Sequence, residues 1–275
     1  MKSLYGLIGE KLGHSFSPQI HGEIFKKLNI SGYYHLFEMD KGDLKDGIKG
    51  MKALKIKGVN VTIPYKIDVM SFLDDLSIEA EKIGAINTIC FQDNKAIGYN
   101  TDYYGFGMML KRYGINVKNK SVVVLGTGGV TKAVLQYLSD EESKEVVLVS
   151  RNVDRAKDKI KGYTIVSYEE LKNFSKRDIV INATPCGMYP KVDYAPVGKD
   201  ILSKFNIAID LIYNPEKTLF LKWAIEEGLK VVNGLYMLVG QAIKAQELWN
   251  NMQIQDSIVE EIYKEISNKI SKTKK

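Results

Sequence analysis

The chain has 275 residues, of which 45% are hydrophobic and 26% charged, and its formal net charge is +6. This length and composition are typical of a globular protein of two domains that bury a hydrophobic core. The sequence contains no apolar run near the ~20 residues that cross a bilayer, no long apolar start typical of a signal peptide and no basic stripe with interleaved aromatic residues. We therefore expect a cytoplasmic protein without a membrane or nucleic-acid partner.

The cysteines and the distribution of charge indicate which kinds of site and ligand to expect. Cys90 and Cys186 are far apart and form no CxxC pair, which fits a reducing compartment and argues against a disulfide framework or a metal site. Lysines are spread along the chain, and the one dense basic cluster is the terminal KISKTKK, which we interpret as a solvated end. The mild positive charge favours a carboxylate substrate and a phosphate-rich cofactor.

The first hundred residues alternate strand and helix patterns. Ser17-Pro18 begins the first helix, because serine is a good N-cap and proline is tolerated at the first helical position. Pro64 stops the third strand, and the turn-like Asp93-Asn94 joins the last two. The predicted strands are 4–9, 33–38, 59–63, 86–91 and 96–99, and the predicted helices start at 17 or span 43–51 and 77–83.

A second pattern begins near Tyr103, where a helix with apolar spacing runs to Tyr113 and ends at Gly114. The following strands are continuous apolar runs, as in buried parallel sheets. They read SVVVLG, EVVLVS, DIVINA, IAIDL and KVV, with helical patterns between several of them. Buried strands that alternate with helices predict a doubly wound parallel sheet.

Two helices end the chain. The first is apolar and spans Leu235 to Trp249; the second carries an apolar stripe of isoleucines at every fourth position, 258, 262, 266 and 270. Because they have too little apolar partner of their own, we expect them to pack on the first domain. The predicted domains are therefore 1–101 plus 236–275, and 102–235.

The glycine-rich segment after SVVVL indicates a cofactor site. Gly126-Thr127-Gly128-Gly129-Val130 allows a tight turn, so that a pyrophosphate can lie at the N-terminus of the next helix. The pattern is GxGGxx rather than a full GxGxxG, and by itself it describes a plain strand-to-helix turn equally well.

The end of the next strand favours NADP over NAD. A fold that binds NAD usually has an acidic residue there that binds the ribose hydroxyls. Here the strand ends in Ser150-Arg151-Asn152, and Arg155 follows one helical turn later. Two arginines suit a 2′-phosphate, which their forked donors can bind; the alternative is two solvated surface arginines.

Polar segments lie where the predicted strands of the first domain end, a position well suited to lining a crevice. They are HSFSPQIH (14–21), NVTIPYK (60–66), GAINT (84–88) and YNTD (99–102). Four further motifs follow along the chain: the GTGG turn, SRN, NATPCGM (182–188) and GLYMLVGQA (234–242). With all these motifs in this order, the sequence resembles the shikimate dehydrogenase family from Gly9 to Gln241.

The resemblance implies an α/β fold of two domains: an N-terminal α/β substrate domain and a Rossmann-like doubly wound NADP-binding domain, with the C-terminal helices packed on the first. It implies a reversible reduction of 3-dehydroshikimate to shikimate by NADPH, on the route to chorismate and the aromatic amino acids. Lys66 matches the catalytic lysine and Asp102 its partner. Whether Lys66 is the proton donor or mainly an electrostatic anchor stays open.

The resemblance also implies binding residues. Ser15 and Ser17 match the hydroxyls that bind the substrate carboxylate, helped by Tyr213. The residues matching those around the ring hydroxyls are Asn60, Thr62, Asn87 and Gln241. The matching cofactor positions are Gly126, Thr127, Gly128, Gly129, Val130, Ser150, Arg151, Asn152, Arg155, Leu211 and Gly234.

Simpler interpretations exist for several of these residues. Ser17 could be only a helix N-cap, Asn60 and Asn87 could serve turn hydrogen bonds, and Gln241 could lie on a solvated helix face. His14 and His21 lie in the first polar segment, and we assign them no chemistry.

The chain departs from the family pattern in two places. Many relatives have Asn-Arg-Thr or Asn-Arg-Ser where this chain has Ser150-Arg151-Asn152, and Gly-Asn-Pro where it has Gly9-Glu10-Lys11. The arginine is kept, so the expected cofactor is unchanged. Functional alternatives are a dual-specificity quinate/shikimate dehydrogenase, a methylene-tetrahydrofolate dehydrogenase and a redox sensor that binds NADP without turnover. The oligomeric state stays open between a monomer and a homodimer.

Overall fold

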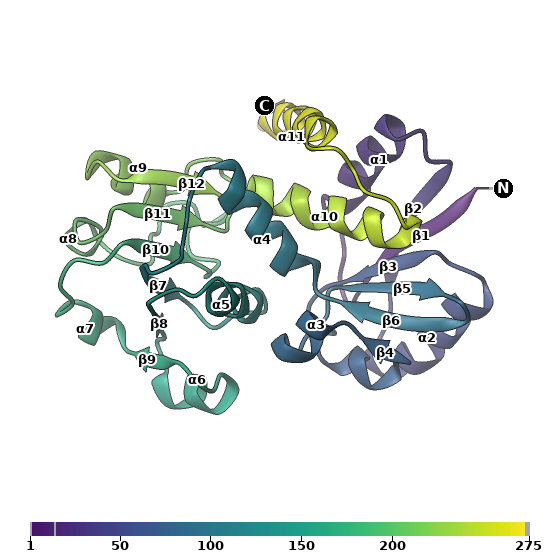
Figure 1. The fold of residues 1–275 in the computed structure, drawn as a ribbon, viewed down its shortest axis with the longest axis horizontal. Helices are drawn as coiled ribbons and strands as arrows, with labels where there is room; N and C mark the ends of the chain where they lie inside the picture. Colours follow the sequence, from purple (N-terminus) through teal and green to yellow (C-terminus); the bar gives the residue numbers. More distant parts are fainter. Residues whose placement is uncertain (1, 14, 273–275) are drawn as a thin grey trace. The chain divides into compact units, whose positions relative to one another are not determined.

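A computed structural model describes residues 2–13 and 15–272, so that His14 and the last three residues of the basic tail lie outside the described part. The chain divides into two compact units: unit 1 is Met1–Gly105 with Val239–Lys275, and unit 2 is Phe106–Leu238. The chain passes between them within α4 (Thr101–Arg112) and α10 (Leu235–Asn250) (Figure 1). The boundaries expected from the sequence fall at the first residues of these two helices.

Unit 1 contains a mixed six-stranded sheet in the order β2-β1-β3-β5-β6-β4. Strands β1, β2 and β3 are parallel, whereas β5 is antiparallel to β3 and to β6. Asp93 and Asn94 have positive φ angles of 49° and 59° and make the predicted tight turn between β5 and β6. The elements are β1 Ser3–Gly9, α1 Ser17–Lys27, β2 Gly32–Glu38, η1 Lys41–Asp43, α2 Leu44–Ala53, β3 Gly58–Val61, η2 Asp68–Phe72, β4 Asp75–Leu76, α3 Ile78–Ile83, β5 Thr88–Gln92, β6 Lys95–Tyr99 and α11 Asp256–Lys272.

Helices cover both faces of this sheet because side chains alternate along each strand. Tyr5 of β1 packs with Phe25 of α1 and Trp249 of α10 on one face, whereas Ile8 of β1 packs with Leu44 of α2 on the other. Figure 1 shows α10 and α2 on opposite sides of β3, β5 and β6.

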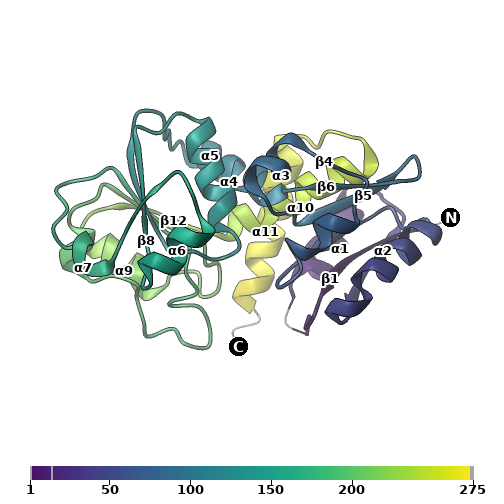
Figure 2. The same ribbon diagram turned by 90° about the horizontal axis from the view of Figure 1, so that it is seen from below.

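The two C-terminal helices pack on unit 1, as the sequence predicted. The indole Nε1 of Trp249 in α10 donates to the carbonyl of Ile89 at 2.9 Å. A Cβ atom at Gly58 would come within 2.0 Å of that nitrogen, so the close approach of α10 requires a glycine in β3. Figures 1 and 2 both show α11 beside α1, and Lys27 of α1 pairs with Glu261 of α11 at 2.8 Å.

The isoleucine stripe of α11 is confirmed in large part. Ile262, Ile266 and Ile270 are buried, and Ile258 is half-buried.

Unit 2 contains a six-stranded parallel sheet in the order β12-β11-β10-β7-β8-β9, so the predicted doubly wound sheet is confirmed. The direction of winding reverses between β7 and β10, where ligands bind in such sheets. The elements are β7 Ser121–Leu125, α5 Thr131–Asp140, β8 Glu145–Val149, α6 Val153–Lys159, β9 Thr164–Val166, α7 Tyr168–Leu171, β10 Ile179–Asn182, α8 Lys199–Leu202, β11 Ile207–Asp210, α9 Leu219–Glu226 and β12 Lys230–Asn233.

The core of unit 2 lies on both faces of its sheet. Val123 and Leu125 of β7 pack against residues of α7, α8 and α9. The intervening Val122 and Val124 are equally buried and point to the opposite face by alternation. Figures 1 and 2 show α5 on that opposite side. The strand β7 is thus buried on both faces, which explains its unbroken apolar sequence.

Candidate active site

A lysine and an aspartate form an ion pair in unit 1. Lys66 lies on the segment after β3, and Asp102 is the second residue of α4. The Lys66 Nζ is 2.6 Å from the Asp102 Oδ2, and the two side chains are 17% and 14% exposed. The N–H of Ile86 donates to the Lys66 carbonyl at 2.8 Å and holds the segment in place. The pair offers an oriented ammonium at the end of a strand, partly shielded from solvent.

Hydroxyl side chains gather at the neighbouring strand ends. Ser15 and Ser17 follow β1, and Thr62 follows β3. Because β1 and β3 are parallel neighbours, these segments leave the sheet at the same edge. The N–H of Thr62 donates to the carbonyl of Ile8 at 3.0 Å, so Thr62 lies directly beside the end of β1.

Ser17 is not the N-cap that the sequence indicated. The N-cap position of α1 is Phe16, whose backbone is already helical at φ −84° and ψ −2° and whose side chain makes no capping hydrogen bond. Ser17 therefore lies inside the first turn. The Oγ of Ser15 accepts from the N–H of Ser17 at 3.2 Å, and the hydroxyl of Ser17 is a hydrogen-bond neighbour of Tyr34. Both serines are half-buried.

Asn60 uses its whole hydrogen-bonding capacity inside the protein. It is 5% exposed, and its Oδ1 accepts from the Tyr34 hydroxyl at 2.8 Å and from His21 Nε2 at 3.1 Å. Its Nδ2 donates to Thr88 Oγ1 at 3.0 Å and to the carbonyl of Asn87 at 3.4 Å. An amide has two donor hydrogens and two acceptor lone pairs. In this arrangement Asn60 therefore supports its neighbours and offers a ligand no group of its own.

Asn87 is buried to the same degree, but it keeps one side of its amide unused. Its Oδ1 accepts from the Thr101 N–H at 2.6 Å and from the hydroxyls of Thr101 and Thr88 at 3.1 Å. Within residues 2–13 and 15–272, its Nδ2 has no hydrogen-bond partner. Asn87 is thus arranged to donate to a ligand.

The glycine turn of unit 2 is shaped by contact across the switch point of the sheet. Gly126 follows β7 with a φ of +99°, and a Cβ there would meet the Thr184 side chain, which follows β10, at 2.6 Å. Gly129 is exposed, with nothing within 4 Å of its Cβ position. The Thr131 hydroxyl donates to the Gly126 carbonyl at 3.1 Å and closes the turn. The N-terminus of α5 is therefore open to a phosphate group.

In the segment after β8, two residues stabilise the loop by hydrogen bonds within it, and two others have exposed side chains. The Ser150 Oγ donates to the Asn152 carbonyl at 2.9 Å and accepts from its N–H at 3.1 Å. The Asn152 side chain caps α6 by accepting from the Arg155 N–H at 2.9 Å. The side chains of Arg151 and Arg155 are exposed. This arrangement can present two guanidinium groups to an anion.

Leu211 and Gly234 touch each other, although they are distant in sequence. Leu211 follows β11 and Gly234 follows β12. A Cβ at Gly234 would lie 2.0 Å from the Leu211 carbonyl oxygen, so only glycine fits. The two predicted cofactor residues therefore form one feature at the carboxyl edge of the sheet.

Tyr213 and Gln241 are the two remaining predicted residues, and each is described within its own unit. Tyr213 belongs to unit 2, is half-buried, and has its pKa raised by burial. Gln241 belongs to unit 1 and is a half-buried residue of α10.

The sequence analysis did not predict a buried polar cluster that lies near the proposed cofactor residues. Asp210 at the end of β11 accepts from Thr218 Oγ1 at 2.5 Å, from the Ile212 N–H at 3.0 Å and from Asn182 Nδ2 at 3.0 Å. Burial raises the pKa of Asp210 to about 7. Asn182 also accepts from the Thr184 N–H and hydroxyl, at 3.0 and 2.6 Å. The signal in the sequence that could have indicated this cluster is the polar residue near the end of each apolar run, Asn182 in DIVINA and Asp210 in IAIDL.

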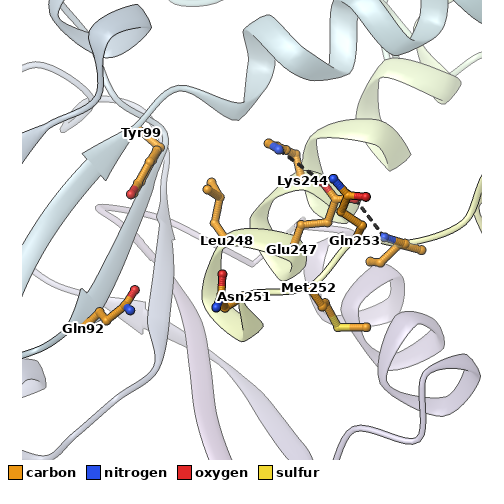
Figure 3. A pocket seen from close by; sticks show the side chains of 9 residues that line it. Gln92, Tyr99, Lys244, Glu247, Leu248, Asn251, Met252 and Gln253 are labelled. Atoms are coloured by element: carbon orange, nitrogen blue, oxygen red, sulfur yellow. Dashed lines mark hydrogen bonds and ion pairs between the residues drawn. The ribbon is translucent and has the colours of Figure 1, made fainter.

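An open pocket of unit 1 lies apart from these residues. It is lined by side chains of β5, β6 and the C-terminal end of α10 with the following loop (Figure 3). Lys244 and Glu247 pair there at 3.3 Å, and Glu247 also accepts from the Ile254 N–H at 2.9 Å. Its charged groups thus satisfy one another, and no predicted site residue lines it.

Residues 2–13 and 15–272 contain no group of three or more histidine, cysteine or acidic side chains able to hold a metal ion. Among the helices of that part, none is both long and apolar enough to span a membrane.

Comparisons with known proteins agree on one family. The pattern of the family described as "Shikimate dehydrogenase substrate binding domain" matches residues 7–89, and that of "Shikimate / quinate 5-dehydrogenase" matches residues 108–189. The chain is 52% identical to a shikimate dehydrogenase (NADP(+)) of Clostridium beijerinckii, over 96% of this chain and 98% of that protein.

Solved structures agree as well. The crystal structure of a chorismate mutase/shikimate 5-dehydrogenase fusion protein from Clostridium acetobutylicum matches with a TM-score of 0.96 and 50% identity, over 98% of this chain and 99% of that chain. The Thermus thermophilus shikimate 5-dehydrogenase, solved in complex with NADP(H) and shikimate, matches with a TM-score of 0.86 and 31% identity, over 96% of this chain and 99% of that chain.

Proposed function

Because the chain belongs to the shikimate dehydrogenase family, we propose that the Lys66–Asp102 pair is its catalytic centre. The protein is an NADP-dependent oxidoreductase that interconverts 3-dehydroshikimate and shikimate, a step in chorismate and aromatic amino acid biosynthesis. The observation that carries the proposal is the 2.6 Å contact between Lys66 Nζ and Asp102 Oδ2, at the sheet edge where three hydroxyl residues follow β1 and β3.

The two side chains have distinct roles in this proposal. When bound, NADPH supplies the hydride. The Lys66 ammonium donates a proton from Nζ to the ring oxygen as that oxygen gains charge, and the Lys66 amine takes the proton back in the reverse direction. The Asp102 carboxylate accepts hydrogen bonds from Nζ and from a ring hydroxyl, and so orients both. The alternative role for Lys66 is an electrostatic anchor that stabilises the charge without transferring a proton.

The substrate is held by neutral donors and acceptors around this pair. We assign the carboxylate to the Ser15 and Ser17 hydroxyls with Tyr213, and the ring hydroxyls to Thr62, Asn87 and Gln241. Asn60, whose four hydrogen-bonding groups are all engaged, acts through its neighbours.

NADP is assigned to the carboxyl edge of the unit 2 sheet. The open turn from Gly126 to Val130 has room for a pyrophosphate at the N-terminus of α5. Arg151 and Arg155 are exposed at the end of β8, where a 2′-phosphate would lie, and Ser150 and Asn152 hold that loop. Leu211 and Gly234, which lie against each other at the same edge, are also assigned to contact NADP.

Finer properties are also proposals. The alternative to strict shikimate specificity is a dual specificity for quinate, supported by the family pattern over residues 108–189, which is described for both substrates. We propose a cytoplasmic monomer or homodimer without a nucleic-acid partner, supported by two free cysteines and a charge spread along the chain. Membership of this family leaves no support for a methylene-tetrahydrofolate dehydrogenase or a non-catalytic sensor.

Replacement of Lys66 tests the catalytic centre. We expect Lys66→Met to lower kcat by roughly 10²–10⁴-fold, the usual contribution of general acid catalysis, and to change the KM for shikimate far less. NADPH absorbance would be followed with shikimate and with quinate, each with NADP and NAD. Lys45→Met, which removes an exposed lysine of α2, is the matched control. A kcat for Lys66→Met within about threefold of the control would rule out the proton-donor role.

A further inference from the structure

A continuous chain of hydrogen bonds runs through the interior of unit 1 and ends at Asn87. It begins on α10, where the Asn250 amide donates to Gln246 Oε1 at 2.9 Å, and Gln246 Nε2 lies 2.8 Å from His21 Nδ1. His21 Nε2 is 3.1 Å from Asn60 Oδ1, whose amide nitrogen donates to Thr88 Oγ1 at 3.0 Å. The Thr88 hydroxyl then donates to Asn87 Oδ1 at 3.1 Å.

Backbone groups at both ends set the direction of every bond in this chain. The Asn250 Nδ2 also donates to the Gln246 carbonyl at 3.0 Å, and a carbonyl can only accept. At the other end, the Thr101 N–H donates to Asn87 Oδ1 at 2.6 Å, and an amide N–H can only donate. Between these anchors, the Gln246 nitrogen faces Nδ1 of His21, so the imidazole carries its proton on Nε2 and donates to Asn60.

The links from Gln246 to Asn87 are buried, whereas Asn250 is half-buried. His21, Gln246, Thr88 and Thr101 are 0% exposed, and Asn60 and Asn87 are 5% and 4% exposed. The His21 ring stacks on Tyr34 at 4.2 Å with an interplanar angle of 9°. Burial lowers the pKa of His21 to about 3, so the ring is neutral, as one donor and one acceptor require. Loss of any link leaves a buried polar group unpaired, which is costly.

We propose that His21 is a positioning residue for the substrate: through Asn60 and Thr88 it holds the Asn87 amide in place, while the Thr101 N–H turns that amide so that its nitrogen faces the ring hydroxyl. The hydroxyl at that position must then accept, which leaves its own proton for an acceptor such as Asp102. The inference rests on the proposed contact between Asn87 and the substrate. It assigns a role to a histidine that sequence reasoning left without chemistry.

The test compares variants that break the chain at different distances from the substrate. His21→Phe keeps a ring to stack on Tyr34 and removes both of its hydrogen bonds, and Gln246→Leu removes the donor one link further away. We expect His21→Phe to raise the KM for shikimate about tenfold, as for one broken buried hydrogen bond, and to leave the KM for NADP within about twofold. Gln246→Leu should act in the same direction, and it serves alone if His21→Phe does not fold.

A double-mutant cycle separates positioning from general damage to the fold. In an Asn87→Ala background, His21→Phe should no longer raise the KM for shikimate, because the amide that it holds in place is gone. Phe25→Leu is the matched control: Phe25 packs in the same aromatic cluster outside the hydrogen-bond chain, so we expect lower stability and an unchanged KM.

The outcomes are distinguishable. If Asn87→Ala leaves the KM for shikimate unchanged, the proposed contact with the substrate is wrong and the inference falls with it. If Asn87→Ala raises the KM while folded His21→Phe and Gln246→Leu do not, the substrate contact stands and the positioning role is overturned. Fully additive effects in the double variant would overturn it as well.

Discussion

Asn60 and Asn87 are the same residue type, equally buried, at the ends of neighbouring strands, and only their partners separate their roles. All four hydrogen-bonding groups of Asn60 are used inside the protein, whereas three donors converge on the Asn87 oxygen and its nitrogen stays available. The resemblance gave both the same role. The number of engaged groups, a property of the folded chain, distinguishes a ligand-binding amide from a supporting one.

The buried carboxyl of Asp210 should make the stability of the protein depend on pH. The folded protein keeps this carboxyl protonated up to about pH 7, whereas an unfolded chain releases the proton near 3.8. The free energy of unfolding contributed by Asp210 is therefore full below pH 4 and falls as pH rises, by about 1.4 kcal/mol per unit, up to about pH 7. Urea denaturation of wild type and Asp210→Asn across pH 4–8 should show this loss in their difference.

The control for that measurement is Asp158→Asn, an exposed carboxylate of α6. Its stability should run parallel to that of wild type over the same pH range. A constant difference between wild type and Asp210→Asn from pH 4 to pH 8 would contradict the assignment of this titration to Asp210.

Among the elements, the turn between β7 and α5 shows how two similar glycines differ. Gly126 has a positive φ and meets Thr184 across the sheet, so an alanine there is strained and crowded. Gly129 has open space around its Cβ position. The first glycine is needed by the fold, and the second leaves room for the cofactor.

Two alanine substitutions should therefore separate stability from cofactor binding. We expect Gly126→Ala to lower the free energy of unfolding by roughly 1–3 kcal/mol. We expect Gly129→Ala to change it by less than about 0.5 kcal/mol and to raise the KM for NADP severalfold, since its methyl group takes space beside the pyrophosphate. Urea denaturation and NADP kinetics would measure the two effects. Normal NADP binding by Gly129→Ala would argue against the turn as the phosphate site.

The net charge of +6 acts on both ligands, because shikimate and NADP are anionic. Long-range attraction raises encounter rates and is screened by salt, with a Debye length of about 10 Å at 0.1 M. We expect kcat/KM for shikimate and NADP to fall roughly threefold between 0.02 and 0.3 M salt, with kcat unchanged. Equal effects of sodium and choline chloride would assign the change to screening. A flat kcat/KM would show that the overall charge does not guide the ligands.

The arrangement of the chain as a whole also explains why the last helices matter to the first strands. Unit 1 is built from both ends of the sequence, and Trp249 of α10 packs on Tyr5 of β1 and bonds to Ile89 of β5. The apolar stripe of α11 predicted that this helix needs a partner. It could not say which element would provide it.

The sequence alone determined those features that depend on residues close together in the chain. The periodicity of hydrophobic residues and the continuous apolar runs predicted the main strands and helices and the doubly wound sheet, and the turn residues predicted the turn at Asp93-Asn94. The motifs in their order indicated the family and, through it, the Lys66–Asp102 pair. It missed β4 and β9, because two or three residues are too few to show a period.

The tertiary structure decided which polar residues support the site and which face it. It placed Ser17 inside the first helical turn, brought Asp210 to Asn182, and joined His21 to Gln246, 225 positions away. The physical reason is that a buried polar side chain is defined by its partners. Those partners can come from distant segments: His21 and Gln246 meet only because both ends of the chain fold into unit 1.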